Sequence, residues 1–284
     1  MNLVLLLLLG AMWGSSYMFI KVTVADVPPF TLVAGRLLMA AVILWGILLA
    51  RRQPVARSRS AWAAFAVMGL LNGAVPYVLI TWGEQTISSG LAALLQATMP
   101  IFTVIMAHLL TEDEHIRPRR VLGIVAGFAG VLVLMLPDLR QGLRENIMGQ
   151  MAIVVSSVSY AGATIFAKRV LRGHAPLMAT TGQITTGALF TLPLSLVFER
   201  PFDLSPSPEA LGSWLGLVLI GTVVAYVIYY GLLARTSATY TSTVTYIIPV
   251  NGLILGALVL GEPLTIVILA SAVLILAGVL LVSK

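Results

Sequence analysis

The side chains that could bind a small molecule in this chain are hydroxyls, amides and aromatic rings within long apolar runs. Tyr226, Tyr229 and Tyr230 fall at positions i, i+3 and i+4 of one run, so a helix would place their hydroxyls on one face. Trp13 and Tyr17 are four residues apart in another run. Polar groups inside a membrane are costly unless they pair or face a cavity. These stripes therefore predict a cavity lined by rings and hydroxyls.

Residues of the same kinds recur in other runs and complete the candidate site. The amide side chains among them can both donate and accept hydrogen bonds, and so could orient a carboxylate or an amine. Two other interpretations stay open, because Tyr and Trp gather at membrane interfaces and polar side chains also join neighbouring helices. The candidate substrate-binding residues are Trp13, Tyr17, Asn72, Tyr77, Gln96, Ser156, Tyr160, Gln183, Tyr226, Tyr230, Thr243 and Tyr246.

The charged residues restrict the substrate and argue against catalysis. All 11 carboxylates fall in connections or at the ends of runs, and Glu84, which comes nearest to an exception, is interpreted as a solvated end residue. Arg36 lies about two turns inside its run, near enough to the surface for its side chain to reach the headgroups. A phosphate site needs several converging cations, so a neutral or zwitterionic solute is favoured.

No catalytic or metal-binding pattern stands out. The chain has no cysteine, which removes thiolate ligands and cysteine nucleophiles. Neither paired aspartates at membrane depth nor an HExxH helix is present. We therefore expect a protein that is not an enzyme and that needs no metal and no cofactor.

The elements that position these residues must lie in lipid. The chain has 284 residues, of which 59% are hydrophobic and 10% charged, against roughly 45–50% and about 25% in soluble domains. About 20 apolar residues cross a bilayer as a helix, so the chain can hold about ten spans. We expect the first run to be a retained helix and not a signal peptide, because no cation precedes Leu3. The runs are Met1–Lys21, Phe30–Ala50, Ala61–Trp82, Ile87–Leu110, Val121–Leu136, Met148–Val170, Met178–Phe198, Leu211–Leu233, Thr239–Leu260 and Leu264–Val282.

The loop charges predict the orientation. If the connections alternate between the two sides, 12 of the 17 Lys and Arg residues lie on the side of the N-terminus and 4 on the other. The positive-inside rule then places both termini in the cytoplasm. The membrane is expected to be a bacterial-type inner membrane. The net charge of +6 is thus a loop asymmetry, and no nucleic-acid partner is expected.

The two halves of the chain resemble each other. Lys21 and Lys168 match at an offset of 147, while Tyr77 and Tyr226 match at 149. Pro100 and Pro249, and Glu114 and Glu262, match at 149 and 148. Five spans in each half mean that the second half enters the membrane upside down, which is typical of secondary transporters that rock around a midplane site. We therefore expect an all-α integral membrane protein of ten helices, built as two inverted five-helix repeats over residues 1–140 and 145–284. The paired prolines are candidate hinges.

These features resemble a known family. The five-plus-five layout with Trp13-Gly14, Arg36, Pro100, Pro249 and Gly261-Glu262 is similar to the EamA type of the drug/metabolite transporter superfamily, and within it to the YddG-like amino acid exporters. The segment from Thr111 to Glu114 departs from the Gly-Glu pair that is usual there. The resemblance implies transport of small metabolites by alternating access.

We therefore expect an exporter of neutral or zwitterionic metabolites, with amino acids, including aromatic ones, as the first choice. Nucleobases or drug-like solutes are the alternative substrates, and an assembly subunit without a path through it is a further alternative. Small residues such as Gly123, Gly127 and Gly130 allow helices to approach closely, either within the chain or across a dimer. The expected partners are the solute and membrane lipids, and the expected assembly is a monomer or a weak dimer.

Overall fold

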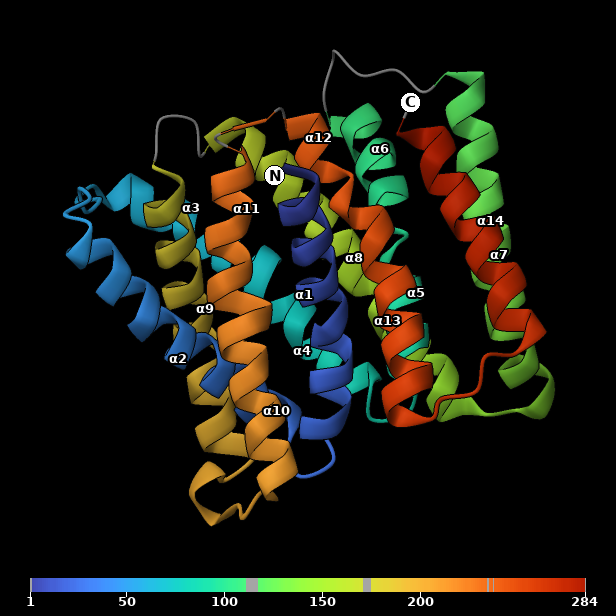
Figure 1. Cartoon of the computed structure of the whole chain (residues 1–284), viewed down its shortest axis with the longest axis horizontal. Helices are drawn as coiled ribbons and strands as arrows, with labels where there is room; N and C mark the ends of the chain where they lie inside the picture. Colours follow the sequence, from blue (N-terminus) through green and yellow to red (C-terminus); the bar gives the residue numbers. More distant parts are fainter. Residues whose placement is uncertain (1, 111–116, 171–174, 234, 237, 284) are drawn as a thin grey trace.

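The fold is a bundle of helices whose two ends carry the connections (Figure 1). The computed structural model describes residues 2–110, 117–170, 175–233, 235–236 and 238–283, and every regular element within these ranges is a helix. The ends of the chain lie at the same end of the bundle (Figure 1). We call this end, which also carries residues 51–58 and 235–236, the N-terminal face. The other end, with residues 24–28, 84–88, 142–143, 199–207 and 261–265, is the opposite face.

The first half of the chain supplies five of the expected spans. Two of them are made of consecutive helices, because α3, the π turn η1 and α4 follow one another without a gap and α5 and α6 are separated by two residues. The elements are α1 (Asn2–Thr23), α2 (Pro29–Ala50), α3 (Arg59–Gly69), η1 (Leu70–Ala74), α4 (Val75–Gly83), α5 (Ser89–Gln96), α6 (Met99–Leu110) and α7 (Pro118–Gln141).

The second half follows the same plan. Its elements are α8 (Arg144–Val170), α9 (Pro176–Phe198), the 3-10 turn η2 (Pro201–Asp203), α10 (Pro208–Val218), the π turn η3 (Leu219–Val224), α11 (Ala225–Leu233), α12 (Ala238–Ser242), α13 (Val244–Leu260) and α14 (Ile266–Val282). Among the described residues, nine helical segments are long and apolar enough to cross a membrane, and α14 is a shorter apolar helix of 17 residues. The chain is thus an all-helical integral membrane protein, as the sequence predicts.

Both halves contain one π turn at a matching position. In η1 the Val75 N–H donates to the carbonyl of Leu70, five residues back, and in η3 the Ala225 N–H donates to the carbonyl of Ile220. Pro76 follows η1 and has no N–H for the regular α-helical bond, which favours the wider turn there. π turns are rare and gather at functional sites, because the extra residue re-aims the side chains that follow.

The spans that hold the candidate hinges are interrupted differently. The first breaks between Gln96 and Met99, so Pro100 is the second residue of α6, where a missing N–H costs nothing. The other breaks at Thr243, and α13 then continues through Pro249. The two prolines therefore stand in different local structures, although they match in sequence.

Related helices of the two halves pack against each other. The matching helices α2 and α9 pack together, as do α7 and α14. In addition, α1 packs on α13 and α4 packs on α8, which are not matching helices. α7 and α14 approach with their backbones nearly in contact, since a Cβ atom on Gly278 would lie 2.6 Å from the carbonyl oxygen of Gly123 and from the amide nitrogen of Gly127. The small residues of these helices thus serve packing within the chain. Lipid offers no hydrophobic drive between helices, so such close contact stabilises the pair.

Candidate functional site

A cavity of about 480 Å³ lies in the middle of the bundle, and its size falls in the range of small-molecule sites. Its wall is built from α1, α2, α3, η1, α4, α5 and α6 of the first half and from α8, α9, α11, α12 and α13 of the second. α7 and α14 contribute no residue to it, since they pack together at one side of the bundle (Figure 1). The cavity is therefore shared by the two halves of the chain.

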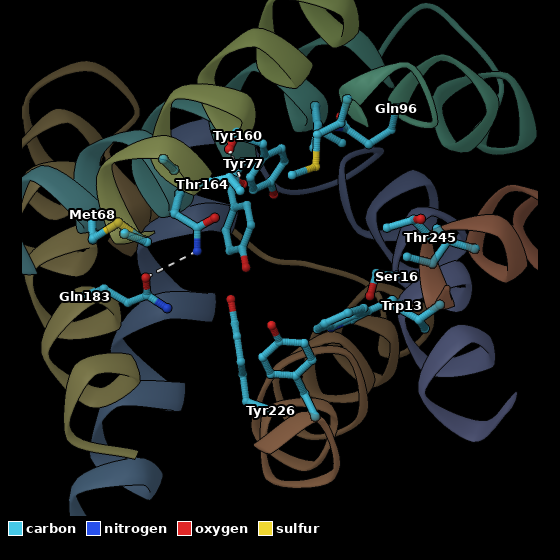
Figure 2. A pocket seen from close by; sticks show the side chains of 18 of the residues that line it. Trp13, Ser16, Met68, Tyr77, Gln96, Tyr160, Thr164, Gln183, Tyr226 and Thr245 are labelled. Atoms are coloured by element: carbon cyan, nitrogen blue, oxygen red, sulfur yellow. Dashed lines mark hydrogen bonds between the residues drawn. The ribbon is translucent and has the colours of Figure 1, made fainter. Parts of the chain in front are cut away.

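Two groups of aromatic rings face each other across this space. Tyr77 and Tyr160 lie on one side and Tyr226 on the other (Figure 2). The Tyr77 and Tyr160 rings are 6.5 Å apart, and the Trp13 ring lies 6.1 Å from that of Tyr226 and 5.6 Å from that of Tyr229. Such ring pairs are favourable and hold the side chains in place. They give the cavity two flat apolar surfaces.

Arg36 brings a positive charge to the wall of the cavity. Its side chain is 5% exposed, and its Nε donates a hydrogen bond of 3.0 Å to the Thr222 hydroxyl in η3. Its Cζ lies 4.0 Å from the centre of the Tyr77 ring, a cation–π contact. The expectation that Arg36 reaches toward the headgroups is therefore wrong, because Thr222 of η3 and Tyr77 of α4 hold the side chain inside the bundle.

The amides are held by one another and by hydroxyls. The Asn72 amide nitrogen donates to the Gln183 amide oxygen at 3.2 Å, a bond visible in Figure 2. The Ser156 hydroxyl donates to the Gln96 amide oxygen at 2.6 Å. The Gln96 amide nitrogen is buried without a partner among the described residues.

The cavity brings together eight of the residues that the sequence singles out: Trp13, Tyr17, Asn72, Tyr77, Gln96, Tyr160, Gln183 and Tyr226. Ser156 lies behind the wall and positions Gln96. Thr243 donates its hydroxyl to the Tyr240 carbonyl, and Tyr246 packs against the main apolar core. The side chain of Tyr230 lies outside the described residues. Thr243 and Tyr246 do not line the cavity, because the helix breaks at residue 243 and the faces on either side of the break are turned. Ser242 and Thr245 line the cavity instead.

Most of the lining residues are related by the internal repeat. Arg36 and Thr164 line the cavity, although the rows of polar side chains in the sequence do not indicate them. Each lies 147 residues from a candidate, Arg36 from Gln183 and Thr164 from Tyr17, so the repeat offset is the signal that would have found them. The pairs are Trp13/Tyr160, Ser16/Ala163, Tyr17/Thr164, Ile20/Ala167 and Arg36/Gln183 at an offset of 147, and Tyr77/Tyr226, Ile80/Tyr229, Gln96/Thr245 and Met99/Ile248 at 149.

The cavity is open toward the N-terminal face. Its lining residues Thr164 and Ser242, near that face, are exposed. Toward the opposite face the lining ends at Ile20 and Ile80, which are 3% and 4% exposed. The cavity is thus closed toward the opposite face in this structure.

Carboxylates from the second half close the opposite face by capping helices of the first half. The Glu199 carboxylate accepts hydrogen bonds from the Phe30 and Thr31 amides at 3.0 and 2.6 Å, at the start of α2. The Glu262 carboxylate accepts from the Ser89 and Gly90 amides at 2.7 and 2.9 Å, at the start of α5. A carboxylate at a helix N-terminus pairs with free amides and with the helix dipole. Glu114, the repeat partner of Glu262, lies outside the described residues.

A further contact at this face depends on Asp26. Its carboxylate accepts hydrogen bonds from the side chain and the amide of Ser207, and these bonds lower the pKa of Asp26. Glu84 lies at the same face but is completely buried, so the expectation that it is a solvated end residue is wrong.

A membrane-embedded helical bundle around a central cavity that is lined by rings, amides and hydroxyls and open to one side is the architecture of a membrane transporter. Comparison with known proteins identifies the family: residues 1–136 and 147–284 each match the EamA-like transporter family, so the chain belongs to it. Its members are named as transporters and not as enzymes, in agreement with the sequence-based expectation.

Relatives match over nearly the whole chain. The chain is similar to the uncharacterized transporter YoaV of Bacillus subtilis, with 27% identity over 94% of this chain and 91% of YoaV. It is also similar to the uncharacterized inner membrane transporter YedA of Escherichia coli K12, with 29% identity over 94% of this chain and 86% of YedA. A solved crystal structure shares the fold with a TM-score of 0.68, covering 99% of this chain and 95% of that one at 17% identity.

Proposed function

We propose that this transporter exports small neutral or zwitterionic metabolites by alternating access across a bacterial-type inner membrane. Amino acids, including aromatic ones, are the proposed main substrates. The observation that carries the proposal is the charge of the cavity. Among the described lining residues Arg36 is the one formal charge, and it stands beside Tyr77 in a wall of rings and amides. A carboxylate would pair with the guanidinium, while an ammonium group or an apolar side chain would meet the ring faces.

The donors at the wall fit such a solute. Apart from the Nε bond to Thr222, the Arg36 guanidinium makes no hydrogen bond with the described residues, so its terminal nitrogens remain for a carboxylate. The rings that line the cavity offer cation–π contacts to the ammonium group of a zwitterion, so such a solute can place both of its charges.

The proposed mechanism rests on the repeat. Lining residues related by constant offsets and two family matches of five spans each support two inverted repeats over residues 1–140 and 145–284. Rocking of these halves would close the N-terminal face and open the opposite one. The excess of Lys and Arg in loops of the N-terminal face supports a cytoplasmic location for that face. Pro100 and Pro249, each next to a lining residue, are the proposed hinges.

Efflux from proteoliposomes tests the function. Vesicles are loaded with labelled phenylalanine, tyrosine, leucine or glycine, and in parallel with labelled nucleobases and with phenethylamine, which lacks a carboxylate. We expect efflux of the amino acids above that of protein-free vesicles and little efflux of phenethylamine. Efflux of nucleobases alone would replace the amino acid assignment with the alternative substrate class. Absence of efflux for every solute, with and without a pH gradient, would contradict transport of these solutes.

A further inference from the structure

Glu84 is a buried carboxyl group that none of the described residues satisfies. It caps the C-terminus of α4, one residue beyond the end of the span at Gly83, and its exposed fraction is 0%. Both of its carboxyl oxygens are buried without a hydrogen-bond partner among the described residues. The hydroxyls of Thr81 and Ser89, on either side of it in sequence, are buried without a partner as well. Buried polar groups are nearly always paired, so this cluster calls for an explanation.

Charged groups from several elements face Glu84. Lys21 on α1 donates from Nζ to the backbone carbonyls of Glu84 and Ile87 at 2.7 and 2.8 Å, and leaves the carboxyl oxygens unpaired. Arg36 on α2, Tyr17 on α1 and Glu262 after α13 also act on it electrostatically. α8 presents Gly149 and Ile153 next to Gly83, and neither can titrate.

These surroundings favour the neutral form of the carboxyl group. Burial raises the pKa of Glu84 well above its usual value, and the nearby Glu262 adds to this, while Lys21 and Arg36 act in the other direction. An ionised carboxylate without hydrogen bonds is costly to bury, whereas a protonated one is tolerated. The closed face thus suits a protonated Glu84.

We propose that Glu84 is a proton-binding site whose occupancy is linked to closure of the opposite face. It goes beyond the proposed substrate but rests on the proposed alternating access, because it requires this face to open. Opening admits water to the carboxyl group, which then ionises at neutral pH; closure takes the proton up again. Acid therefore favours the closed face and alkali the open one. With one proton linked, the ratio of open to closed molecules changes by at most about tenfold per pH unit.

The surroundings fit a proton better than a metal cation. Lys21 occupies the backbone carbonyls of Glu84 and Ile87, and its own charge and that of Arg36 repel a cation. Asp26 does not account for the same pH dependence, because its pKa is lowered and the group stays ionised at neutral and alkaline pH. The proton linkage therefore belongs to Glu84.

Cysteine labelling tests the linkage without reference to any substrate, because the chain has no native cysteine. Ile87 is 4% exposed beside Glu84, so its thiol in an Ile87→Cys variant reports opening of the opposite face to an impermeant maleimide. Rates in proteoliposomes are measured between about pH 6 and pH 9 and divided by those of Ser205→Cys, an exposed loop position at the same face. This ratio corrects for ionisation of the thiol itself.

We expect the corrected rate to rise with pH, by up to about tenfold per unit, and to become low and independent of pH when Glu84→Gln is added. Glu84→Asp, which keeps a titrating group, should retain a pH dependence, and Glu209→Gln, which removes an exposed carboxylate, should change nothing. If Glu84→Gln fails to fold, Glu84→Asp decides, because it must shift the midpoint of the profile.

A profile that is flat in the parent, or unchanged by both Glu84 variants, overturns the proton site alone. A dependence on sodium at constant pH that Glu84→Gln abolishes replaces the proton with a metal cation. No labelling of Ile87→Cys under any condition, with or without amino acids, contradicts opening itself and so both proposals.

Discussion

Arg36 fixes a positive charge against one wall of the cavity. The Thr222 hydroxyl and the Tyr77 ring hold the guanidinium from two sides, so a bound solute would meet a rigid fork of donors. Rigid donors lose little freedom on binding, which makes the contact specific for a planar anion such as a carboxylate. The proposed specificity thus depends mainly on this side chain.

Replacing Arg36 with Gln removes the charge but keeps a polar side chain. Hydrogen bonds to charged groups contribute about 1.5–3 kcal/mol, so the affinity for phenylalanine should fall about tenfold to a hundredfold. The affinity for solutes without a carboxylate should change little. The concentration dependence of transport measures both, with Arg140→Gln, an exposed arginine at the end of α7, as the matched control. An equal loss for both kinds of solute would mean that Arg36 acts only on the fold.

Some functional residues were predictable from the sequence and others were not. The difference lies in what decides where the side chain points. Tyr77, Tyr160 and Tyr226 were predictable because a polar ring within a span has few stable places other than a cavity or an interface. The roles of Arg36 and Glu84 depend on which neighbours pack over them, since a charge near a span end can point either to water or inward. Only the contacts of Arg36 with η3 and α4, and of Lys21 with the backbone at Glu84, decide these cases.

At the scale of the helices, breaks and close contacts divide the bundle into mobile and fixed parts. The ten apolar runs were predictable from hydropathy, but the π turns and the break at residue 243 were not, because they depend on local hydrogen bonding. All the interrupted spans line the cavity, together with the uninterrupted helices α1, α2, α8 and α9, whereas α7 and α14 do not. Bending is therefore expected beside the cavity and rigidity at the side.

Pro100→Ala tests the first of the proposed hinges. Alanine restores an N–H at the second residue of α6, which can join α6 to α5 through the Gln96 carbonyl. One such bond contributes about 1 kcal/mol, so transport should slow about fivefold while membrane insertion stays intact. Flux in reconstituted vesicles measures the effect. Pro193→Ala, at an exposed position within α9 and away from the cavity lining, is the control, and an unchanged flux in Pro100→Ala would rule out the hinge.

Gly278→Leu tests whether the close contact between α7 and α14 stabilises the fold. The added side chain meets the backbone of Gly123 and Gly127, so α7 and α14 must separate, at a cost of about 1–3 kcal/mol. The Tm in detergent should fall. Gly46→Leu, at a position in α2 where a Cβ meets no heavy atom within 4 Å, should leave it nearly unchanged. Equal effects of the two substitutions would show that the α7–α14 contact does not stabilise the fold.

For the molecule as a whole, the closed opposite face depends on a few bonds between the two halves of the chain. Glu199 and Glu262 each receive two backbone hydrogen bonds from helices that belong to the other half. Opening this face would break them, so they bias the protein toward the state that is open at the N-terminal face. Constant offsets in the sequence predict which residues of the two halves line the cavity together, but they do not predict the side on which the cavity is open.

Glu199→Ala and Glu262→Ala should therefore shift the molecule toward the other access state. Each removes charge-assisted bonds worth about 1.5–3 kcal/mol, so the fraction open at the opposite face should rise about tenfold or more. The labelling rate of Ile87→Cys at constant pH measures this fraction. Glu209→Ala, an exposed carboxylate in the first turn of α10, is the matched control. Labelling no faster than in this control would show that the caps do not set the balance.

The pairing of Arg36 with Gln183 places a charged residue in one half of the cavity and a neutral one at the matching position of the other half. If the halves exchange roles between the two access states, a solute bound through its carboxylate to the first half meets a charged partner there and a neutral one in the second half. The two proposed states then cannot be equal in energy. A carrier of this kind has different half-saturation concentrations on its two sides. Without coupling to an ion gradient, its maximal rates must differ in the same proportion, so that flux still vanishes at equal concentrations.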